Sequence, residues 1–271
     1  MDDNTVWQTL QRACRDGDLA AVRQILDGGI AMNQKRYDSC LNNLCALCHS
    51  GPVPSFQGYV DTARLLLDLG ADPNATCRLG TDDTSPLMSA TTWCHAALAQ
   101  LLLTRGANVN HRLSKANGTA LTQTCRYACY RSTSEPVDIA RLLLDHGADI
   151  HLADACGRTP LHYACHAPTN YHVATVGQKV RVVRLLLERG AASDFYRKDD
   201  EGRTPLEMSS EDDEYDSDGE LVAVAVRHPL MKALLRKHFA IVVRKYVIGP
   251  PAEHPHRRIE HVAPHIASYL V

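Results

Sequence analysis

Two kinds of apolar block alternate along the first 210 residues of the chain. The first kind is a leucine-rich run that ends in Gly-Ala-Asp or a similar turn, as in DTARLLLDLGADPN at 61–74. Such a run predicts a helix that stops at its glycine, because glycine readily adopts the left-handed conformation that ends many helices. The block occurs at 20–33, 61–74, 98–110, 138–151 and 181–194.

The second kind of block lies between these runs and begins with Thr-Pro-Leu or a related sequence. It occurs at 84–92, 118–126, 157–165 and 202–210, with weaker versions at 7–14 and 38–45. Threonine can cap the start of a helix, and proline suits the first turn because the N–H that it lacks would have no partner there. One block of each kind makes a helix-turn-helix unit, and the glycines from Gly29 to Gly190 recur every 36 to 43 residues. The chain is therefore predicted to be a tandem array.

This unit resembles the ankyrin repeat, whose usual period is about 33 residues. The resemblance is carried by TPLH at 159–162 and by GADPN at 70–74, and it covers roughly residues 5–240 as about six repeats. It implies an all-α fold, an ankyrin-repeat solenoid of stacked helix-turn-helix units with short β-hairpin fingers. Ala120 stands where proline is usual, and several periods exceed 33 residues.

The resemblance divides the chain into an ankyrin-repeat domain, residues 1–240, and a C-terminal capping or docking segment, residues 241–271. The first and last repeats are degenerate, as expected at the ends of a solenoid. Extra residues fall mostly between the two helices of a repeat, which would place them along one rim. They are either tolerated surface loops or a second binding rim. These inserts are 49–59, 130–136, 166–178 and the acidic segment 211–220.

The charge of the chain is nearly balanced, with 29 basic and 31 acidic residues and a net charge of −2. No overall field draws it to nucleic acid or to a membrane, so we expect a monomer that recognises a partner protein by shape. The N-terminus has no apolar signal region, and no stretch approaches the ~18 apolar residues of a membrane span. A cytoplasmic or nuclear location is expected.

The ten cysteines invite a metal or disulfide interpretation. Cys45 and Cys48 look like half a zinc site, but no second pair completes it. The repeat alignment instead places Cys14, Cys45, Cys125 and Cys165 at one position, which needs a small buried side chain. We predict that these four are buried and unpaired, because stacked copies lie beyond the ~7 Å Cα separation that a disulfide allows.

No catalytic motif is present, neither a phosphate-binding glycine loop nor a nucleophile elbow. The resemblance implies that His162 is a structural imidazole bonded to neighbouring backbone. The acidic segment departs from a calcium loop, since Ala225 stands where a bidentate glutamate is needed. We therefore expect no enzyme activity, no cofactor and no metal site.

The resemblance implies a concave binding face, formed by hairpin tips and by the last residues of each first helix. Exposed tryptophan, tyrosine and arginine most often dominate interface energy. The alternative is that Trp93 and Tyr127 pack beneath neighbouring inserts. The candidates at helix ends are Thr92, Trp93, Arg126, Tyr127 and His166, and the candidates assigned to hairpins are Arg36, Lys115 and Arg158.

The C-terminal segment offers one further signal. Residues 262–270 resemble the end of an F-box-like module, without its leading Leu-Pro, and some ankyrin proteins carry such a module to join ubiquitin-ligase complexes. Apolar residues from Ile259 to Leu270 follow one helical face. A plain capping helix is the alternative. The sequence thus predicts a protein-binding scaffold or adaptor, or alternatively a substrate receptor of a ubiquitin ligase.

Overall fold

The computed structural model describes residues 3–30, 32–47, 56–79, 82–112, 118–127, 136–166 and 173–208. Its helices form one pair for each of repeats 1 to 5, and a single described helix opens repeat 6. The pairs are α1 (Asp3–Asp16) with α2 (Leu19–Asp27), α3 (Gln34–Leu47) with α4 (Phe56–Asp68), α5 (Pro86–Thr92) with α6 (Ala96–Thr104), α7 (Ala120–Tyr127) with α8 (Pro136–Asp145), and α9 (Pro160–Cys165) with α10 (Val173–Glu188). Repeat 6 begins with α11 (Pro205–Met208), after the 3-10 turn η1 (Ala191–Tyr196).

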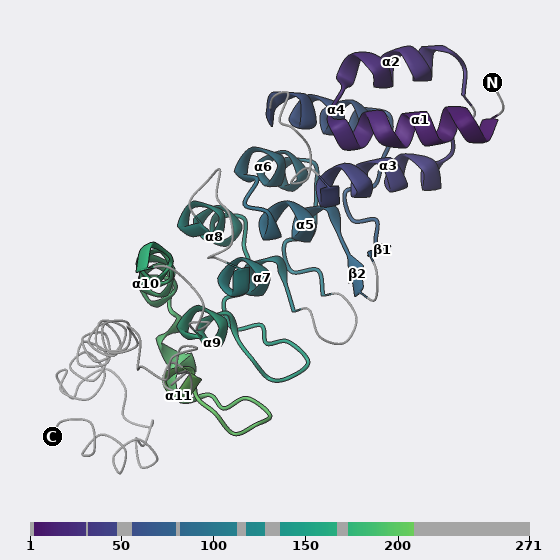
Figure 1. Cartoon of the computed structure of the whole chain (residues 1–271). Coiled ribbons are helices and arrows are strands. Elements are labelled where there is room, and N and C mark those ends of the chain that lie inside the picture. Colours follow the sequence, from purple (N-terminus) through teal and green to yellow (C-terminus); the bar gives the residue numbers. More distant parts are fainter. Residues whose placement is uncertain are drawn as a thin grey trace, which may run out of the picture.

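The helix pairs stack in chain order (Figure 1). Each first helix packs on the first helix of the next repeat, from α1 through α11, and each second helix packs on the next second helix, from α2 through α10. Contacts between neighbouring repeats, rather than between distant segments, therefore build the fold, as in a solenoid. The predicted helical solenoid is confirmed.

A short hairpin is present in the third repeat. Strand β1 (Cys77–Leu79) pairs antiparallel with β2 (Asp82–Thr84), with Cys77 opposite Thr84. Figure 1 shows that this hairpin and the loops that precede α9 and α11 project on the same side of the stack. The fold is thus helical with short finger-like connections.

The leucine runs of the second helices form the core of the stack. The middle leucine of each run is fully buried, namely Leu66, Leu102, Leu143 and Leu186. The leucine runs also predict that the first leucine of each run is buried, and this holds for Leu101 and Leu185, whereas Leu65 and Leu142 are only half-buried. Successive helical residues point about 100° apart, so the first leucine of a run can reach the edge of the buried face.

Helices begin at the capping residues and end at the glycines that the sequence predicted. Thr159 caps α9, and its hydroxyl lies 2.9 Å from Nδ1 of His162. Ser85 caps α5 and accepts the N–H of Met88 at 3.3 Å. Gly70 has a φ of 98°, a left-handed conformation that a side chain would strain. These local signals explain why the helices begin and end where they do.

Asparagine side chains join the turns of successive repeats. Asn74 donates from Nδ2 to the Gly106 carbonyl at 3.1 Å and accepts the N–H of Asn108 at 2.7 Å. Asn110 makes the same two bonds to the turn of the following repeat, at 3.0 and 2.7 Å. An amide suits this role because it carries both donors and an acceptor. We call these contacts of Asn74 and Asn110 the asparagine ladder.

The four cysteines at the shared repeat position are buried thiols. They are Cys14, Cys45, Cys125 and Cys165, and none forms a disulfide. The prediction that this position holds a small buried side chain is confirmed. Cys48, the second member of the candidate zinc pair, lies outside the described residues.

Candidate protein-binding face

The ends of three neighbouring first helices carry four of the predicted binding residues. Helix α5 packs on α7, and α7 packs on α9. Thr92 is the last residue of α5 and Trp93 is its C-cap, Arg126 lies in the last turn of α7, and His166 is the C-cap of α9. The structure therefore brings these residues to adjacent helix ends in repeats 3, 4 and 5.

Thr92 and Trp93 are half-buried. The Thr92 hydroxyl donates to the Met88 carbonyl at 2.8 Å, and the Trp93 backbone N–H donates to the Ser89 carbonyl at 3.2 Å. The next residue, Cys94, has a φ of 55°, which is uncommon for a residue other than glycine. The chain therefore turns sharply after Trp93, which keeps part of the indole accessible at the helix end.

Arg126 is exposed and is held by the next repeat. Its guanidinium carbon lies 5.6 Å from the centre of the Tyr163 ring, a cation–π contact. Tyr163 is only 8% exposed, and its hydroxyl donates to Oδ2 of Asp154 at 2.5 Å. Burial and this hydrogen bond raise the pKa of Tyr163 to about 12, so the phenol stays neutral. Asp154 holds the Tyr163 ring, and the ring contacts Arg126 at the junction of repeats 4 and 5.

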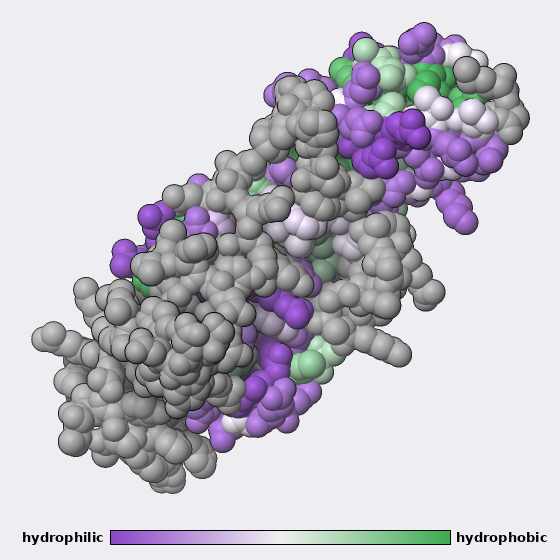
Figure 2. Space-filling view, in the orientation of Figure 1, coloured by the Kyte–Doolittle hydropathy of each residue, from purple (hydrophilic) through white to green (hydrophobic). Residues whose placement is uncertain are grey.

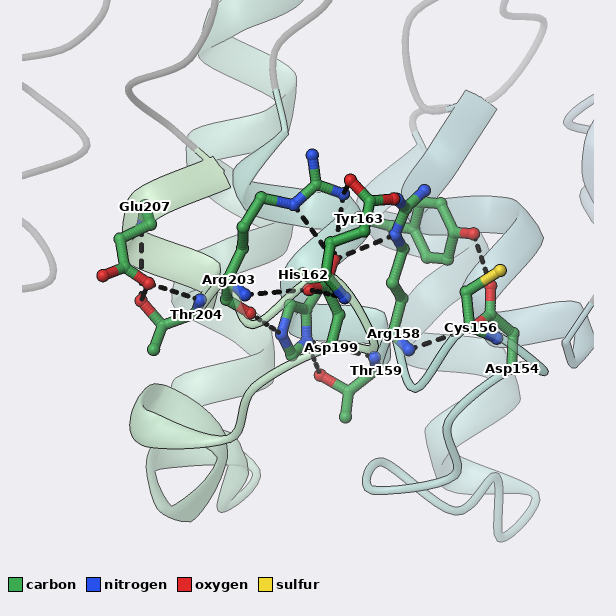
Figure 3. Close-up of polar contacts among 11 residues, drawn as sticks. Asp154, Cys156, Arg158, Thr159, His162, Tyr163, Asp199, Arg203, Thr204 and Glu207 are labelled. Carbon is green, nitrogen blue, oxygen red and sulfur yellow. Dashed lines mark hydrogen bonds and ion pairs between the residues drawn. The ribbon is translucent and has the colours of Figure 1, made fainter.

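Asp154 and Asp199 organise two successive loop tips in the same way (Figure 3). Oδ1 of each carboxylate accepts the backbone N–H groups two and four residues further along the chain, at 2.9 to 3.0 Å. Gly157 and Gly202 supply the left-handed turn, with φ of 74° and 79°. The repeated sequence Asp-x-x-Gly-Arg is thus the signal for this tip, and the sequence analysis overlooked it.

Arg158 lies between two loop tips instead of extending freely from one of them. Its Nε is 3.2 Å from Oδ2 of Asp199 and its Nη2 is 2.5 Å from Oε1 of Glu201. Arg203 binds the same two carboxylates, at 3.0 and 2.6 Å. Burial alone would raise the pKa of Asp199, but hydrogen bonds from Arg203 and Arg158 lower it to about 2. Arg158 therefore joins repeats 5 and 6.

The assignment of Arg36 to a hairpin is wrong, because this residue lies in the first turn of α3. Asn33 starts the helix early, and its Oδ1 accepts the Arg36 N–H at 2.9 Å. Residues 34–38 contain no glycine or proline to interrupt the helix. The Arg36 guanidinium carbon lies 5.2 Å from the Trp7 ring centre and links repeats 1 and 2. Arg36 is thus two repeats away from Arg126 in the stack.

A buried lysine of α10 reaches the C-terminal end of α9. Lys179 is 2% exposed, and its Nζ donates to the Tyr163 carbonyl at 2.9 Å and to the His166 carbonyl. A cation offsets the negative partial charge of these helix-end carbonyls. Burial raises the pKa of Cys125 and Cys165 to about 12, and the nearby Lys179 charge opposes that rise. The sequence analysis missed this lysine, because lysine is seldom fully buried.

Two predicted binding residues cannot be placed in this face. Lys115 lies outside the described residues, and Tyr127 is the last residue of α7 but its side chain is not among those described. The acidic segment 211–220 and the C-terminal segment 241–271, with its F-box-like stretch, also lie outside the described residues.

His162 has the structural role that was predicted. Its Nδ1 accepts the Thr159 N–H at 3.1 Å, so the proton lies on Nε2, which faces the Arg203 carbonyl at 3.3 Å. Burial lowers the pKa of His162, which favours the neutral ring. Within the described ranges, no three His, Cys, Asp or Glu side chains are grouped to hold a metal ion.

The surface of the described residues is mixed in character. Figure 2 shows hydrophilic residues over most of the edge formed by the loops that precede α9 and α11, and a hydrophobic area over the N-terminal helices. None of the helices in the described part of the chain is long and apolar enough to cross a membrane.

Comparison with known proteins agrees with this architecture. The family model for ankyrin repeats in three copies matches residues 54–154 and 126–224, which together make up more than half of the chain. An ankyrin repeat protein of fowlpox virus is 30% identical over 180 residues, or 65% of this chain and 46% of that protein.

Two further relatives combine ankyrin repeats with a second module. Ankyrin repeat and SOCS box protein 11 of Danio rerio is 38% identical over 130 residues, covering 47% of this chain and 36% of that protein. Ankyrin repeat and SOCS box protein 3 of Homo sapiens is 27% identical over 162 residues, covering 60% and 28%. The chain thus spans less than half the length of these three relatives. Its helix-pair stack and the match to the family model together show that the chain belongs to the ankyrin-repeat family.

Proposed function

We propose that the chain is a non-enzymatic scaffold or adaptor that binds a partner protein across the ends of α5, α7 and α9. Ankyrin repeats are protein-interaction modules, which supports this class of function. The observation that carries the proposal is the exposed guanidinium of Arg126, fixed over the Tyr163 ring in the same row of helix ends as Thr92 and Trp93.

The geometry of these side chains suits an interface. A guanidinium that is already positioned loses less conformational freedom when it binds, so more of its interaction energy appears as affinity. The accessible part of the Trp93 indole offers apolar area beside it. Neighbouring helices pack about 8–10 Å apart, so an extended partner segment can contact both residues.

Substitution of the two central residues tests this proposal. For Trp93→Ala and Arg126→Ala we expect the affinity for a partner isolated with the full chain to fall by ~2 kcal/mol or more, as at an interface anchor. Arg141→Ala is the matched control, because Arg141 is exposed on α8 of the same repeat as Arg126. Unchanged affinity in both variants would remove these residues from the binding site. A large drop in melting temperature for Trp93→Ala would assign that residue to the core.

A second candidate function is a ubiquitin-ligase substrate receptor that docks through residues 241–271. Two observations favour it: the similarity to ankyrin repeat and SOCS box proteins, and the amphipathic pattern from Ile259 to Leu270. In this function the repeats hold the substrate while the C-terminal segment contacts the ligase.

Charged substitutions on the C-terminal apolar face test the receptor function in the full chain. Ile266→Asp with Leu270→Asp should abolish co-purification of ligase components, because a charge cannot be buried there without a partner. Binding to the repeat-face partner should be unchanged. If ligase components are absent from the wild-type preparation as well, the receptor function is ruled out and the scaffold function stands.

A further inference from the structure

We propose that Cys14 and Cys40 form a site of reversible oxidation, at which a peroxide converts the two thiols into a disulfide that ties repeat 1 to repeat 2. The site is formed by α1 and α3, the first helices of these repeats. It does not include the ends of α5, α7 and α9, so it does not depend on the proposed partner-binding face.

The two thiols meet inside the junction of α1 and α3. Cys14 lies near the end of α1, and Cys40 lies in the middle of α3. These helices pack side by side (Figure 1), and both cysteines are 0% exposed. The side chains of Cys14 and Cys40 are hydrogen-bonded to each other. A disulfide needs its two Cβ atoms about 3.5–4.5 Å apart, and sulfur atoms in hydrogen-bond contact are already close to that arrangement.

A second pair of cysteines shows what distinguishes this contact. Cys125 and Cys165 are also buried in neighbouring first helices, α7 and α9, but they occupy the same repeat position. Cys40 occupies a different position, where Pro160 stands in repeat 5, and this offset brings it to Cys14. Cys165 acts on Cys125 through its charge, whereas Cys14 and Cys40 share a hydrogen bond. Cys125 and Cys165 therefore provide an internal control for the oxidation.

Hydrogen peroxide is the oxidant in this step. One sulfur, as the thiolate, attacks a peroxide oxygen, so that the O–O bond breaks, a water leaves and a sulfenic acid forms. The second thiol then displaces the hydroxyl group of the sulfenic acid as a second water, and the S–S bond forms. The two thiols together lose two protons and two electrons, and one hydrogen peroxide becomes two waters. A thiol reductant reverses the step by exchange.

Local opening of repeat 1 gives the peroxide access to the pair. In the closed stack the hydrogen bond with Cys40, together with burial, raises the pKa of the Cys14 thiol, so it stays protonated. Within the described part of the chain, α1 packs on one other first helix, α3, whereas α3 packs on both α1 and α5. The end unit of such a stack opens at a lower free energy than a central unit. One sulfur is therefore oxidised while repeat 1 is open, and reclosure brings the second thiol onto it.

The disulfide changes how freely repeat 1 can open. It closes a loop that runs from Cys14 to Cys40 and contains α2. Such a cross-link stabilises mainly by restricting the opened chain, and more so for a longer loop. Oxidation thus holds the first repeat against the second, and reduction lets it open again.

Hydrogen peroxide treatment of the folded full chain tests the site, with tryptic digestion in the absence of reductant. The exposed Cys156 is first replaced, as Cys156→Ser, to limit bonds between chains. We expect a linked pair of peptides, residues 13–15 with Cys14 and residues 37–64 with Cys40. Its yield should exceed that of any link between Cys125 and Cys165 by at least about tenfold, because only the first pair has the geometry of a disulfide.

Two variants assign the bond, because peptide 37–64 also contains Cys45 and Cys48. Cys40→Ala should abolish the link. Cys45→Ala removes another buried thiol from α3 and is the matched control, so it should retain the link. The proposal is overturned if the link is absent, if its yield is equal in the two variants, if Cys125 and Cys165 are linked to the same extent, or if it forms only after the chain is unfolded in denaturant.

Amide hydrogen exchange measures the tie between the repeats. In the oxidised chain we expect exchange in α1 to slow at least about tenfold relative to the reduced chain. Exchange in α8 should be unchanged, and Cys40→Ala should show no slowing when it is oxidised. A linked chain in which α1 exchanges as fast as in the reduced chain would refute the tie. No partner is used in these measurements, so their failure leaves the proposed binding face as it stands, and failure of that face leaves the oxidation site.

Discussion

At the scale of single residues, the last described repeats depend on buried carboxylates that organise loop tips. Asp154 and Asp199 each bind two backbone N–H groups, and each then anchors a side chain from outside its own tip, Tyr163 for Asp154 and Arg158 for Asp199. Removing one partner of such a pair is costly because the other charge stays buried. Both carboxylates thus shape their turns, and Asp199 also ties repeat 5 to repeat 6.

The lowered pKa of Asp199 predicts a loss of stability in acid. Its pKa falls from the usual 3.8 to about 2 in the folded state, so its contribution is complete above pH 4 and disappears as the pH falls from about 4 to 2. The shift corresponds to about 2 kcal/mol. Chemical denaturation at a series of pH values measures this loss in the free energy of unfolding.

Two variants isolate this contribution. Asp199→Asn should flatten the pH dependence between about pH 4 and 2 and lower the stability at neutral pH, since the two guanidinium groups lose their buried carboxylate and keep only the exposed Glu201. Asp200 is an exposed neighbour on the same loop tip. Asp200→Asn should change neither the pH dependence nor the stability at neutral pH. An unchanged acid profile in Asp199→Asn would show that the ion pairs do not contribute to stability.

The Tyr163 contact predicts different effects for two substitutions. Tyr163→Phe keeps the ring under Arg126 but leaves Asp154 without one hydrogen bond, so we expect a stability loss of ~1–2 kcal/mol with little change in partner affinity. Tyr163→Leu also removes the cation–π contact and should weaken partner binding. Equal binding by both variants would mean that the ring does not position Arg126.

At the scale of helices and turns, the sequence specified the repeat unit well. Leucine runs, terminal glycines such as Gly70, and the Thr-Pro starts located the helix pairs, because each signal acts locally. The early start of α3 was missed, because no glycine or proline separates Asn33 from the rest of the helix. The binding face was harder to predict. Tyr163 and Lys179 contact residues of other helices, and the periodicity within one helix does not predict such contacts.

The asparagine ladder predicts a measurable coupling between turns. Asn74→Ala removes two hydrogen bonds to the next repeat, and Asn110→Ala removes the equivalent two. We expect each to lower the free energy of unfolding by ~1 kcal/mol, a modest value because water can replace bonds in exposed turns. Gln100→Ala on the exposed face of α6 is the control and should be neutral. A neutral Asn74→Ala would show that the ladder is incidental to stability.

At the scale of the whole molecule, the described repeats from α1 to α11 share no central core between distant segments. Each repeat packs on the one before and the one after, from α1 to α11. In such an array stability is close to a sum over units and junctions, so disturbance spreads from its origin along the stack. The solenoid also suits a protein-binding function, since it offers an extended surface whose side chains can vary while the backbone scaffold stays constant.

A buried charge in a central repeat should therefore loosen its neighbours first. In Leu143→Asp we expect amide hydrogen exchange to accelerate in α6, α7, α8 and α10 before it does so in α1 and α2. Val22→Asp, at a buried position of the first repeat, should give the reverse order. A uniform rise in exchange along the chain in both variants would contradict the repeat-by-repeat model.

The asparagine ladder also gives the stack a direction. Asn74 and Asn110 each reach forward to the turn of the following repeat and hold its carbonyl and N–H. A chain is synthesised from its N-terminus, so the receiving amide is made before the turn that it will hold. At these two junctions the asparagine of the earlier repeat can therefore hold the next turn as soon as that turn leaves the ribosome.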